Sequence, residues 1–437
     1  MKHTMKWIQM VCICSLLFVV FTGCSTGGGG TASQADGGVK PAGKVSLRFA
    51  WWGSEGRHKA ILEAISLYMS KHPNVTIEAE YGGFDGYYQK LVTQFAGGTA
   101  PDLTPLSFDW IDEIAVKGDL VMDLNTQKDN LNLSAFNSDF LNKYVVFNNK
   151  MVGLPMGING MVTAYNKEFF KKFNIPEDTK WDWDNLHEFG KKVHQQDANA
   201  YLLSMLDVRG FLQPYVKQKT GKQWINTDKT LGFDQATLAE ALTYYKKLLD
   251  DGVLQPVAES SLYPEITQNI TWQKGNIGIA FGLSSTITKL KSFIPQIDVS
   301  MYPVPQNAKD SGVLVNPSNP LAINKSSKFP EEAAKFAGWL LTDPEAALIL
   351  RDTYSIPAVE KNSQALVEKQ LVDPTVAKAV KIALEKPGEP LNGISSNQEL
   401  IKLVEDYMQQ VAFGRTTPDA AAQEIIKRLN DKLKAIK

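Results

Sequence analysis

Aromatic and charged side chains gather directly after two short apolar runs of the sequence. Trp52 ends the run at residues 45–52, and Asp109 and Trp110 follow the run at residues 102–107. Flat aromatic rings can cover the apolar C–H face of a pyranose, while carboxylates, amides and arginines hydrogen-bond its hydroxyls. The residue types at these places are those that non-covalent recognition of a sugar requires.

Other groupings could in principle support covalent or metal chemistry, but none has the required spacing. The stretch HEFGKKVH at residues 187–194 does not place its histidines at a zinc-binding spacing. The stretch GVKPAGKV nearly matches a phosphate-binding P-loop, but Val45 replaces the hydroxyl that holds magnesium. Acidic neighbours such as Asp182 and Asp184 begin expected helices and form no acid–base pair for glycoside hydrolysis. We therefore expect no catalytic residue, no metal and no cofactor.

The N-terminal segment has the layout of a signal peptide. Two lysines precede an apolar run at residues 7–21, which is shorter than the roughly 20 apolar residues of a membrane-spanning helix. Cys24 follows the small residues Thr22 and Gly23, a pattern that resembles the lipobox of bacterial lipoproteins. We expect residues 1–23 to be removed and Cys24 to carry a lipid; the alternative is an uncleaved anchor helix with an incidental cysteine.

Composition limits the remaining classes of protein. Residues 24–43, rich in glycine and small polar residues, are expected to form a flexible tether. Residues 44–437 are too many for one core and suggest two lobes. The formal net charge of −1 becomes about −3 without the two N-terminal lysines, so there is no basic excess for nucleic-acid binding. Removal of Cys12 and Cys14 with the signal peptide leaves no disulfide and no cysteine catalysis.

The apolar pattern predicts alternating strands and helices over residues 45–107. Expected strands cover residues 45–52, 75–81 and 102–107; the first helix ends at Pro73, and the second is capped by Asp85 and closed by Gly97 and Gly98. Such alternation favours a parallel sheet in which ligands bind beyond the carboxyl ends of the strands. Three loops are thereby selected, at residues 51–57, 82–87 and 107–110.

A second region of strands and helices begins near residue 155, so the chain is expected to be of the α/β class. The expected elements are a strand at 153–166, a helix capped by Asp182, a helix at 234–250, strands within 271–285 and 297–305, a polar loop at 316–319 before a short strand, a helix at 331–347 and amphipathic helices from 361 to 437. Trp272 is expected in the core, and Asp102 is expected to orient a turn.

Five sequence blocks resemble, in their order, extracellular solute-binding protein family 1, the maltodextrin-binding type of receptor for carbohydrate ABC importers. The blocks are FAWWGSE, YYQKLVTQFAGGTAPDL, GLPMGINGMVTAYNKEFF, WQKGNIGIAF and PLAINKSSKFPEEAAKFAGWLLTDPEA. The resemblance implies a two-lobed α/β fold of the periplasmic-binding-protein type II, with a ligand cleft between the lobes and hinge closure on binding.

The resemblance also implies how the chain is divided. The N-terminal lobe would comprise residues 44–155 plus 300–355, and the C-terminal lobe residues 156–299 plus 356–437. The chain would cross between the lobes near residues 155–160, 303–305 and 355–357.

Ligand-binding positions of the family carry over to aromatic, polar and charged residues here. The predicted ligand-binding residues are Trp52, Glu55, Arg57, Asp109, Trp110, Asn159, Arg209, Phe211, Phe281, Gly282, Ser284 and Tyr354. Trp51 and Trp52 point to opposite sides of their strand, and we expect Trp52 to face the ligand. Arg57 is either a partner for an acidic sugar or a solvated arginine paired with Glu55. Together with Arg209, it favours a uronate-containing ligand.

The resulting hypothesis is a lipid-anchored receptor on the extracellular face of the cell membrane. It would act as a monomer, capture an oligosaccharide and deliver it to permease subunits that work with a separate ATPase. Two alternatives stay open. One is a secreted carbohydrate-active enzyme with a similar aromatic cleft; the other is a receptor for a non-sugar solute such as a polyamine, whose site would depend on one charge pair rather than on aromatic rings.

Overall fold

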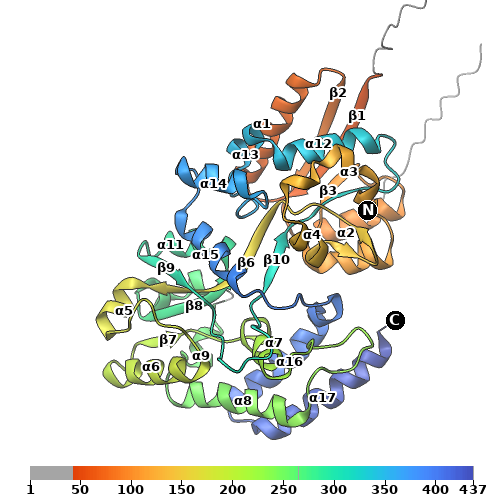
Figure 1. Cartoon of the computed structure of the whole chain (residues 1–437). Helices are drawn as coiled ribbons and strands as arrows, with labels where there is room; N and C mark the ends of the chain where they lie inside the picture. The colour runs from red at the N-terminus through yellow and green to blue at the C-terminus, as the bar shows by residue number, and fades with distance from the viewer. Residues whose placement is uncertain (1–42, 264, 437) are drawn as a thin grey trace, which may run out of the picture. The chain divides into compact units, whose positions relative to one another are not determined.

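The computed structural model describes residues 43–263 and 265–436, so the expected signal peptide, Cys24 and most of the tether lie outside the described residues. Residues 44–437 form one unit by their contacts and build two main sheets, each with its own helices (Figure 1). The apolar residues around each sheet form separate buried clusters. We call the cluster around β1 the first core and the cluster around β6 the second core.

The first sheet has four strands in the order β11-β3-β1-β2. Its strands are β1 Val45–Trp52, β2 Val75–Gly82, β3 Leu103–Pro105 and β11 Leu321–Ile323, and its helices are α1 Glu55–Lys71, α2 Tyr87–Ala96, α12 Pro330–Thr342 and α13 Pro344–Leu350. β1 lies parallel to β2 and β3, whereas β11 runs antiparallel to β3. The parallel arrangement predicted for the first three strands is confirmed.

Successive side chains of β1 point to opposite faces of this sheet. Leu47, Phe49 and Trp51 are fully buried in the first core, together with residues of α1 and α12. Trp52 points to the other face, where it packs in a smaller apolar cluster with Leu91 of α2. The period-2 alternation of the strand therefore separates the two adjacent tryptophans, as expected.

The second sheet is mixed and is built around one long strand. Its strands are β6 Gly157–Asn166, β7 Tyr201–Leu203, β8 Ile277–Leu283, β9 Ile297–Ser300 and β10 Val315–Ser318. β6 pairs antiparallel with β8, β9 and β10, and β7 runs parallel to β8. All ten residues of β6 are buried, which explains why this part of the sequence reads as a nearly continuous run of apolar and small residues.

The other elements are mostly helices. The longer ones are α5 Lys167–Phe173, α6 Trp183–Gln196, α7 Gln213–Thr220, α8 Gln235–Asp250, α14 Glu360–Glu368, α15 Pro374–Glu385, α16 Gln398–Ala412 and α17 Pro418–Ala435. The shorter ones are α3 Lys128–Leu131, α4 Ser138–Tyr144, α9 Val257–Ser260, α10 Ile270–Gln273 and α11 Ile287–Lys291, with a small hairpin of β4 Val146–Phe147 and β5 Lys150–Met151. Single helical turns comprise Phe108–Trp110, Asp112–Lys117, Leu124–Gln127, Leu133–Ala135, Val208–Leu212, Ile266–Gln268, Ser284–Thr286 and Gly393–Ser396.

Local signals at helix starts were reliable in one case and misleading in another. Asp182 caps α6 by exchanging hydrogen bonds with Asn185, which confirms the predicted cap. Asp85 does not cap α2, so that prediction is wrong. The residue before this helix is Gly86, which lies in the left-handed region at φ +76°, and no side chain caps the helix.

The stretch at residues 316–319 also differs from its prediction as a loop. Its residues up to Ser318 belong to β10, which pairs with β6. Pro317 is tolerated because β10 is an edge strand that pairs only with β6. The N–H group that proline lacks is therefore not needed for a hydrogen bond to a second neighbouring strand.

Three stretches of chain connect the two sheets. They are residues 155–156, 319–320 and 353–356. The crossing expected at residues 303–305 instead lies within the second core, because β9 and β10 on either side of it both pair with β6. Residues 300–318 therefore pack with the second sheet rather than with the first, which differs from the division implied by the resemblance.

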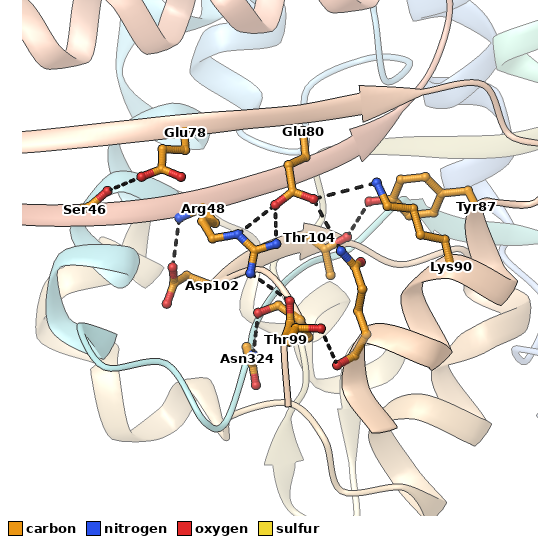
Figure 2. Close-up of polar contacts among 12 residues, drawn as sticks. Ser46, Arg48, Glu78, Glu80, Tyr87, Lys90, Thr99, Asp102, Thr104 and Asn324 are labelled. Carbon is orange, nitrogen blue, oxygen red and sulfur yellow. Dashed lines mark hydrogen bonds and ion pairs between the residues drawn. The ribbon is translucent and has the colours of Figure 1, made fainter. Parts of the chain in front are cut away.

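Asp102 and Arg48 tie the start of β1 to neighbouring segments (Figure 2). Oδ2 of Asp102 accepts the backbone N–H of Arg48 at 2.8 Å, and Oδ1 accepts the hydroxyl of Ser327 at 2.6 Å. The guanidinium of Arg48 pairs with Glu80 on β2 and donates to the carbonyl of Thr99 at 2.7 Å. β3 begins only at Leu103, so no carbonyl of β3 pairs with the backbone N–H of Arg48. The carboxylate of Asp102 accepts this N–H instead. Asp102 therefore has a structural role, as predicted, but it holds β1 and Ser327 rather than orienting a turn.

Replacing Asp102 by alanine should lower the free energy of unfolding by about 1–3 kcal/mol, because the part-buried N–H of Arg48 would lose its acceptor. Urea denaturation measures this difference. Asp85→Ala is the matched control, since Asp85 is exposed and makes no hydrogen bond or ion pair within residues 43–263 and 265–436. If both variants unfold at the same urea concentration as the original chain, the contact has no such importance.

Candidate functional site

A cavity of about 390 Å³ is lined by residues that belong to both sheets. Ser107 and Phe108, which follow β3, form one wall. The second sheet and its helices supply the rest, namely Asn159, Met161, Asp207, Arg209, Gly210, Phe281, Gly282, Leu283, Leu314, residues 316–319, Leu391 and Ser396. Two larger hollows, of about 540 and 860 Å³, are each lined from one side only. Only a cavity with walls from both sides can couple a ligand to closure, so we take the first as the candidate site.

Asn159 on β6 is held in one orientation by its neighbours. Its Oδ1 accepts the hydroxyl of Ser284 at 3.3 Å and the backbone N–H of Ser285 at 3.2 Å. The Oγ of Ser284 also accepts the N–H of Gly160. Because a backbone N–H can only donate, the amide oxygen must face Ser285, and the amide nitrogen of Asn159 remains available to the cavity. Ser284 is fully buried, so it positions Asn159 and does not line the cavity.

A second amide lies directly across the strand pair from Asn159. Asn316 on β10 is the register partner of Asn159, so both side chains leave the same face of the sheet. Oδ1 of Asn316 is buried and accepts no hydrogen bond within the described residues. An unpaired buried acceptor usually indicates a missing partner, such as a ligand or a water molecule. The pair offers both amide donors and an acceptor at the cavity wall.

The charged groups of the cavity lie at the start of the helical turn Val208–Leu212. Asp207 caps this turn, with its Oδ1 accepting the N–H of Gly210 at 2.5 Å. Arg209 donates to the carbonyl of Ser396 at 3.3 Å. Burial and the nearby Asp207 raise the pKa of Glu405, while Lys402 and Arg209 act in the opposite direction. Arg209 thus brings a cation to the cavity wall beside two carboxyl groups.

Several helical segments begin at this cavity. Ser107 precedes the turn Phe108–Trp110, Asp207 precedes the turn that continues into α7, and Leu283 precedes the turn that continues into α11. Ser396 lies just before Asn397, the N-cap of α16. Helix starts carry partial positive charge and N–H groups without a helical partner. Asp207 and Asn397 already cap two of these starts, so the uncapped starts at Ser107 and Leu283, together with Arg209, are what favour an anionic group in the cavity.

The aromatic part of the wall comes from Phe281 and Phe108. Phe281 on β8 is half-buried, and its ring packs edge-on against Tyr302 with centroids 4.9 Å apart. Gly282 follows it, where a Cβ would lie 3.0 Å from Oγ1 of Thr286. Phe108 was not singled out by residue number in the sequence, although its loop was. A ring held in this way can cover one face of a sugar.

Two predicted ligand residues lie away from the cavity in this structure. Phe211 is fully buried in the second core, where its ring lies 5.3 Å from those of Trp183 and Tyr215. Within the turn Val208–Leu212, Arg209 is at the cavity while Phe211 points into the core. Tyr354 is also buried, beneath Arg57. Neither ring lines the cavity, so their predicted roles find no support here.

Arg57 serves the main chain rather than an acidic partner. It donates to the carbonyl of Thr353 at 2.7 Å and to that of Trp52 at 3.0 Å, and its guanidinium lies 4.1 Å from the ring of Tyr354. Burial lowers the pKa of Arg57. Glu55 is exposed at the start of α1 and makes no ion pair with Arg57 in the described part of the chain. The expected Arg57–Glu55 pair is therefore wrong, because the arginine is turned toward the connecting stretch 353–356.

The predicted aromatic residues of the first sheet lie next to the cavity. Trp52 and Trp110 are buried side by side, with ring centroids 4.8 Å apart. Trp51 is in the first core and donates from its Nε1 to Nδ1 of His58 at 3.1 Å. Asp109 lies in the turn Phe108–Trp110, immediately after two lining residues, but its side chain is outside what the structure describes. Its predicted role stays a prediction.

No group of three or more His, Cys, Asp or Glu side chains suited to a metal ion occurs among the described residues. In the same part of the chain, we find no helix with the length and apolar character that crossing a membrane requires.

Comparisons with known proteins agree with the resemblance. A periplasmic solute-binding protein from Pectobacterium atrosepticum is 29% identical, with a TM-score of 0.82 over 90% of this chain and 99% of that one. An oligogalacturonide-binding protein from Yersinia enterocolitica, solved with saturated digalacturonic acid, is 26% identical, with a TM-score of 0.77 over 90% of this chain and 99% of that one. The galactooligosaccharide-binding protein of Bacillus subtilis is 20% identical over 88% of this chain and 89% of its own.

These likenesses confirm the mixed α/β fold of a periplasmic solute-binding protein. The sequence profile of the family described as bacterial extracellular solute-binding protein matches residues 52–347, which is well over half of the chain. The chain therefore belongs to the family of bacterial extracellular solute-binding proteins.

Proposed function

We propose that this protein is the receptor subunit of an ABC importer and that it binds an oligosaccharide in the cavity between its two sheets. The observation that carries the proposal is the cavity itself, with the oriented amide of Asn159, the cation of Arg209 and the ring of Phe281 on one wall. Amides and a guanidinium suit hydroxyls and carboxylates, and a ring suits the C–H face of a sugar. Two of the similar proteins are named for binding oligosaccharides, which supports the same class of ligand.

We further propose that the oligosaccharide contains uronate units. Arg209 and the helix starts favour a carboxylate in the cavity, and the Yersinia protein was solved with an acidic disaccharide. Arg57 no longer contributes to this argument, because main-chain carbonyls occupy it. Asp207 uses one carboxylate oxygen to cap its own turn, which reduces its suitability as the single acidic partner of a polyamine.

The remaining parts of the proposal concern location and assembly. We propose that residues 1–23 are a signal peptide and that a lipid on Cys24 holds the receptor at the extracellular face of the membrane. The monomer would present the loaded cavity to permease subunits whose ATPase is a separate chain. A receptor of this kind performs no covalent step, in contrast to the carbohydrate-active enzyme kept as the alternative.

Contacts of the segment at residues 389–396, which lines part of the cavity, support closure around the ligand. Lys143 on α4 pairs with Glu389 at 2.9 Å, and Glu389 belongs to the segment that also supplies Leu391 and Ser396 to the cavity wall. In the same segment, a Cβ on Gly393 would lie 2.7 Å from Cβ of Asp112. These close approaches fit a state in which the two sides of the cavity have come together.

The thermal stability of residues 44–437 with added ligands tests the proposed function. The probes are saturated digalacturonic acid, a neutral galactooligosaccharide and spermidine. We expect stabilisation by digalacturonic acid, about 2.7 kcal/mol at a hundred times Kd, because the ligand binds only the folded state. Stabilisation by spermidine alone would contradict the sugar assignment, and turnover of either oligosaccharide would support the enzyme alternative.

Arg209→Gln should weaken binding of digalacturonic acid about 10- to 100-fold, because a charge-assisted hydrogen bond contributes about 1.5–3 kcal/mol. The neutral galactooligosaccharide should be affected less. Titration calorimetry measures both affinities. Arg415→Gln is the control, because Arg415 is exposed and lies over Phe413, outside the cavity. An equal loss for the acidic and the neutral sugar would contradict the role of Arg209 as reader of a carboxylate.

Gly393→Ala should weaken ligand binding about 5- to 100-fold while leaving the stability of the ligand-free protein unchanged. The added methyl would lie too close to Asp112 in the closed state, and overpacking of this kind costs about 1–3 kcal/mol. The matched control is Gly56→Ala, where the nearest atom to a new Cβ is 3.9 Å away. Calorimetry and thermal unfolding separate the two effects; unchanged affinity in Gly393→Ala would mean that this approach is not part of closure.

A further inference from the structure

Phe84 is a large aromatic residue that the fold leaves exposed beside the candidate site. It lies in the turn between β2 and α2, and 55% of its surface is exposed. Its ring is stacked on that of Trp110, at 13° between planes and 5.6 Å between centroids. Trp52 approaches the same ring at 60° with centroids 5.8 Å apart, so Trp110 and Trp52 cover part of the ring and leave the rest open.

The exposed ring of Phe84 packs on a rigid aromatic base, which consists of Trp110 and the rings around it. Trp110 is only 9% exposed and packs against Trp52, Tyr87 and Tyr88, with centroids 4.8, 6.2 and 5.3 Å away. The hydroxyl of Tyr87 is itself hydrogen-bonded to Oγ1 of Thr104 at 3.0 Å. A ring held on such a base loses little conformational freedom when another surface stacks on it, so the contact adds more to affinity.

The base is continuous with the wall of the cavity. Ser107 and Phe108 line the cavity, and Trp110 ends the same helical turn two residues later. Phe84 follows the carboxyl end of β2, the strand next to β1, at the sheet edge where β1 and β3 also end. Phe84 therefore lies at the same edge of the first sheet as Ser107 and Phe108, which line the cavity.

We propose that Phe84 is a stacking platform for a second sugar ring, so that the ligand has at least one unit in the cavity and a further unit on Phe84. This inference rests on the proposed function and adds a subsite to it. A solvent-exposed flat ring with its back face covered suits the apolar C–H face of a pyranose, and it places no demand on the charge of that unit. The cavity recognises the carboxylate of one sugar unit, and Phe84 favours ligands that have a second unit.

Titration calorimetry with galacturonic acid, digalacturonic acid and trigalacturonic acid tests the subsite. Phe84→Ala should bind the two longer ligands about tenfold more weakly, because burial of an aromatic side chain is lost. Galacturonic acid should bind the variant and the original chain equally. Phe84→Trp should retain the affinity for the longer ligands, whereas Phe84→Leu should recover only part of it. Phe293→Ala is the control, since Phe293 is 46% exposed and has no ring contact in the described part of the chain.

The possible outcomes separate this subsite from the proposed function. Unchanged affinity of Phe84→Ala for digalacturonic and trigalacturonic acid overturns the subsite and leaves the proposed function intact. Normal affinity combined with lost transport in vesicles that contain the permease also overturns it, because the ring would then contact the permease. If the original chain binds none of the three acids, both proposals fail. If Phe84→Ala does not fold, the contrast between Phe84→Trp and Phe84→Leu decides the question.

Discussion

The pairing of β6 is the constraint on which the rest of the structure depends. This buried strand pairs with β10 at its beginning and with β8 and β9 further along, so it has neighbours on both sides. Its first residues are also packed closely: a Cβ on Gly157 would lie 2.2 Å from the carbonyl oxygen of Tyr354, and one on Gly160 would lie 2.3 Å from the Cβ of Ala383. Only glycine permits these approaches. The same short stretch of β6 carries Asn159. One segment of backbone therefore both follows the connection between the sheets and positions a residue of the ligand site.

From this arrangement follows a site whose polar groups are oriented before a ligand arrives. Asn159 is fixed by Ser284 and Ser285, and Arg209 is placed by a turn that Asp207 caps. On the other side, Trp110 is held by its aromatic neighbours. Oriented donors and rigid rings lower the entropy cost of binding, which a receptor for flexible oligosaccharides particularly needs. The connecting stretch 353–356, held by Arg57 and by the hydroxyl of Ser355 on the carbonyl of Ile158, joins the two parts without entering the site.

Sequence reasoning succeeded where the signal was local and failed where it was not. The alternation of β1 and the cap of α6 depend on strand periodicity or on residues close in sequence, and both were predicted. Pairing of β10 with β6, by contrast, joins residues about 157 positions apart, so a polar stretch that contains Pro317 looked like a loop. Arg57 was misread for the same reason, since its main partner is Thr353. Leu391 and Ser396 had no local feature that could mark them as cavity residues. Of the three loops selected from the sequence, the one after β3 supplies Ser107 and Phe108 to the cavity wall, because sheet topology places it at the edge where the strands end.

A crystal structure of residues 44–437 with saturated digalacturonic acid tests the central claim most directly, namely that the ligand is held between the two sheets. The account predicts the disaccharide in the cavity, with a carboxylate about 2.7–2.9 Å from the guanidinium of Arg209 and a ring face on Phe281. The amide nitrogen of Asn159 should donate to the same sugar. A ligand bound elsewhere, or in the cavity without contact to Asn159 and Arg209, would contradict the account.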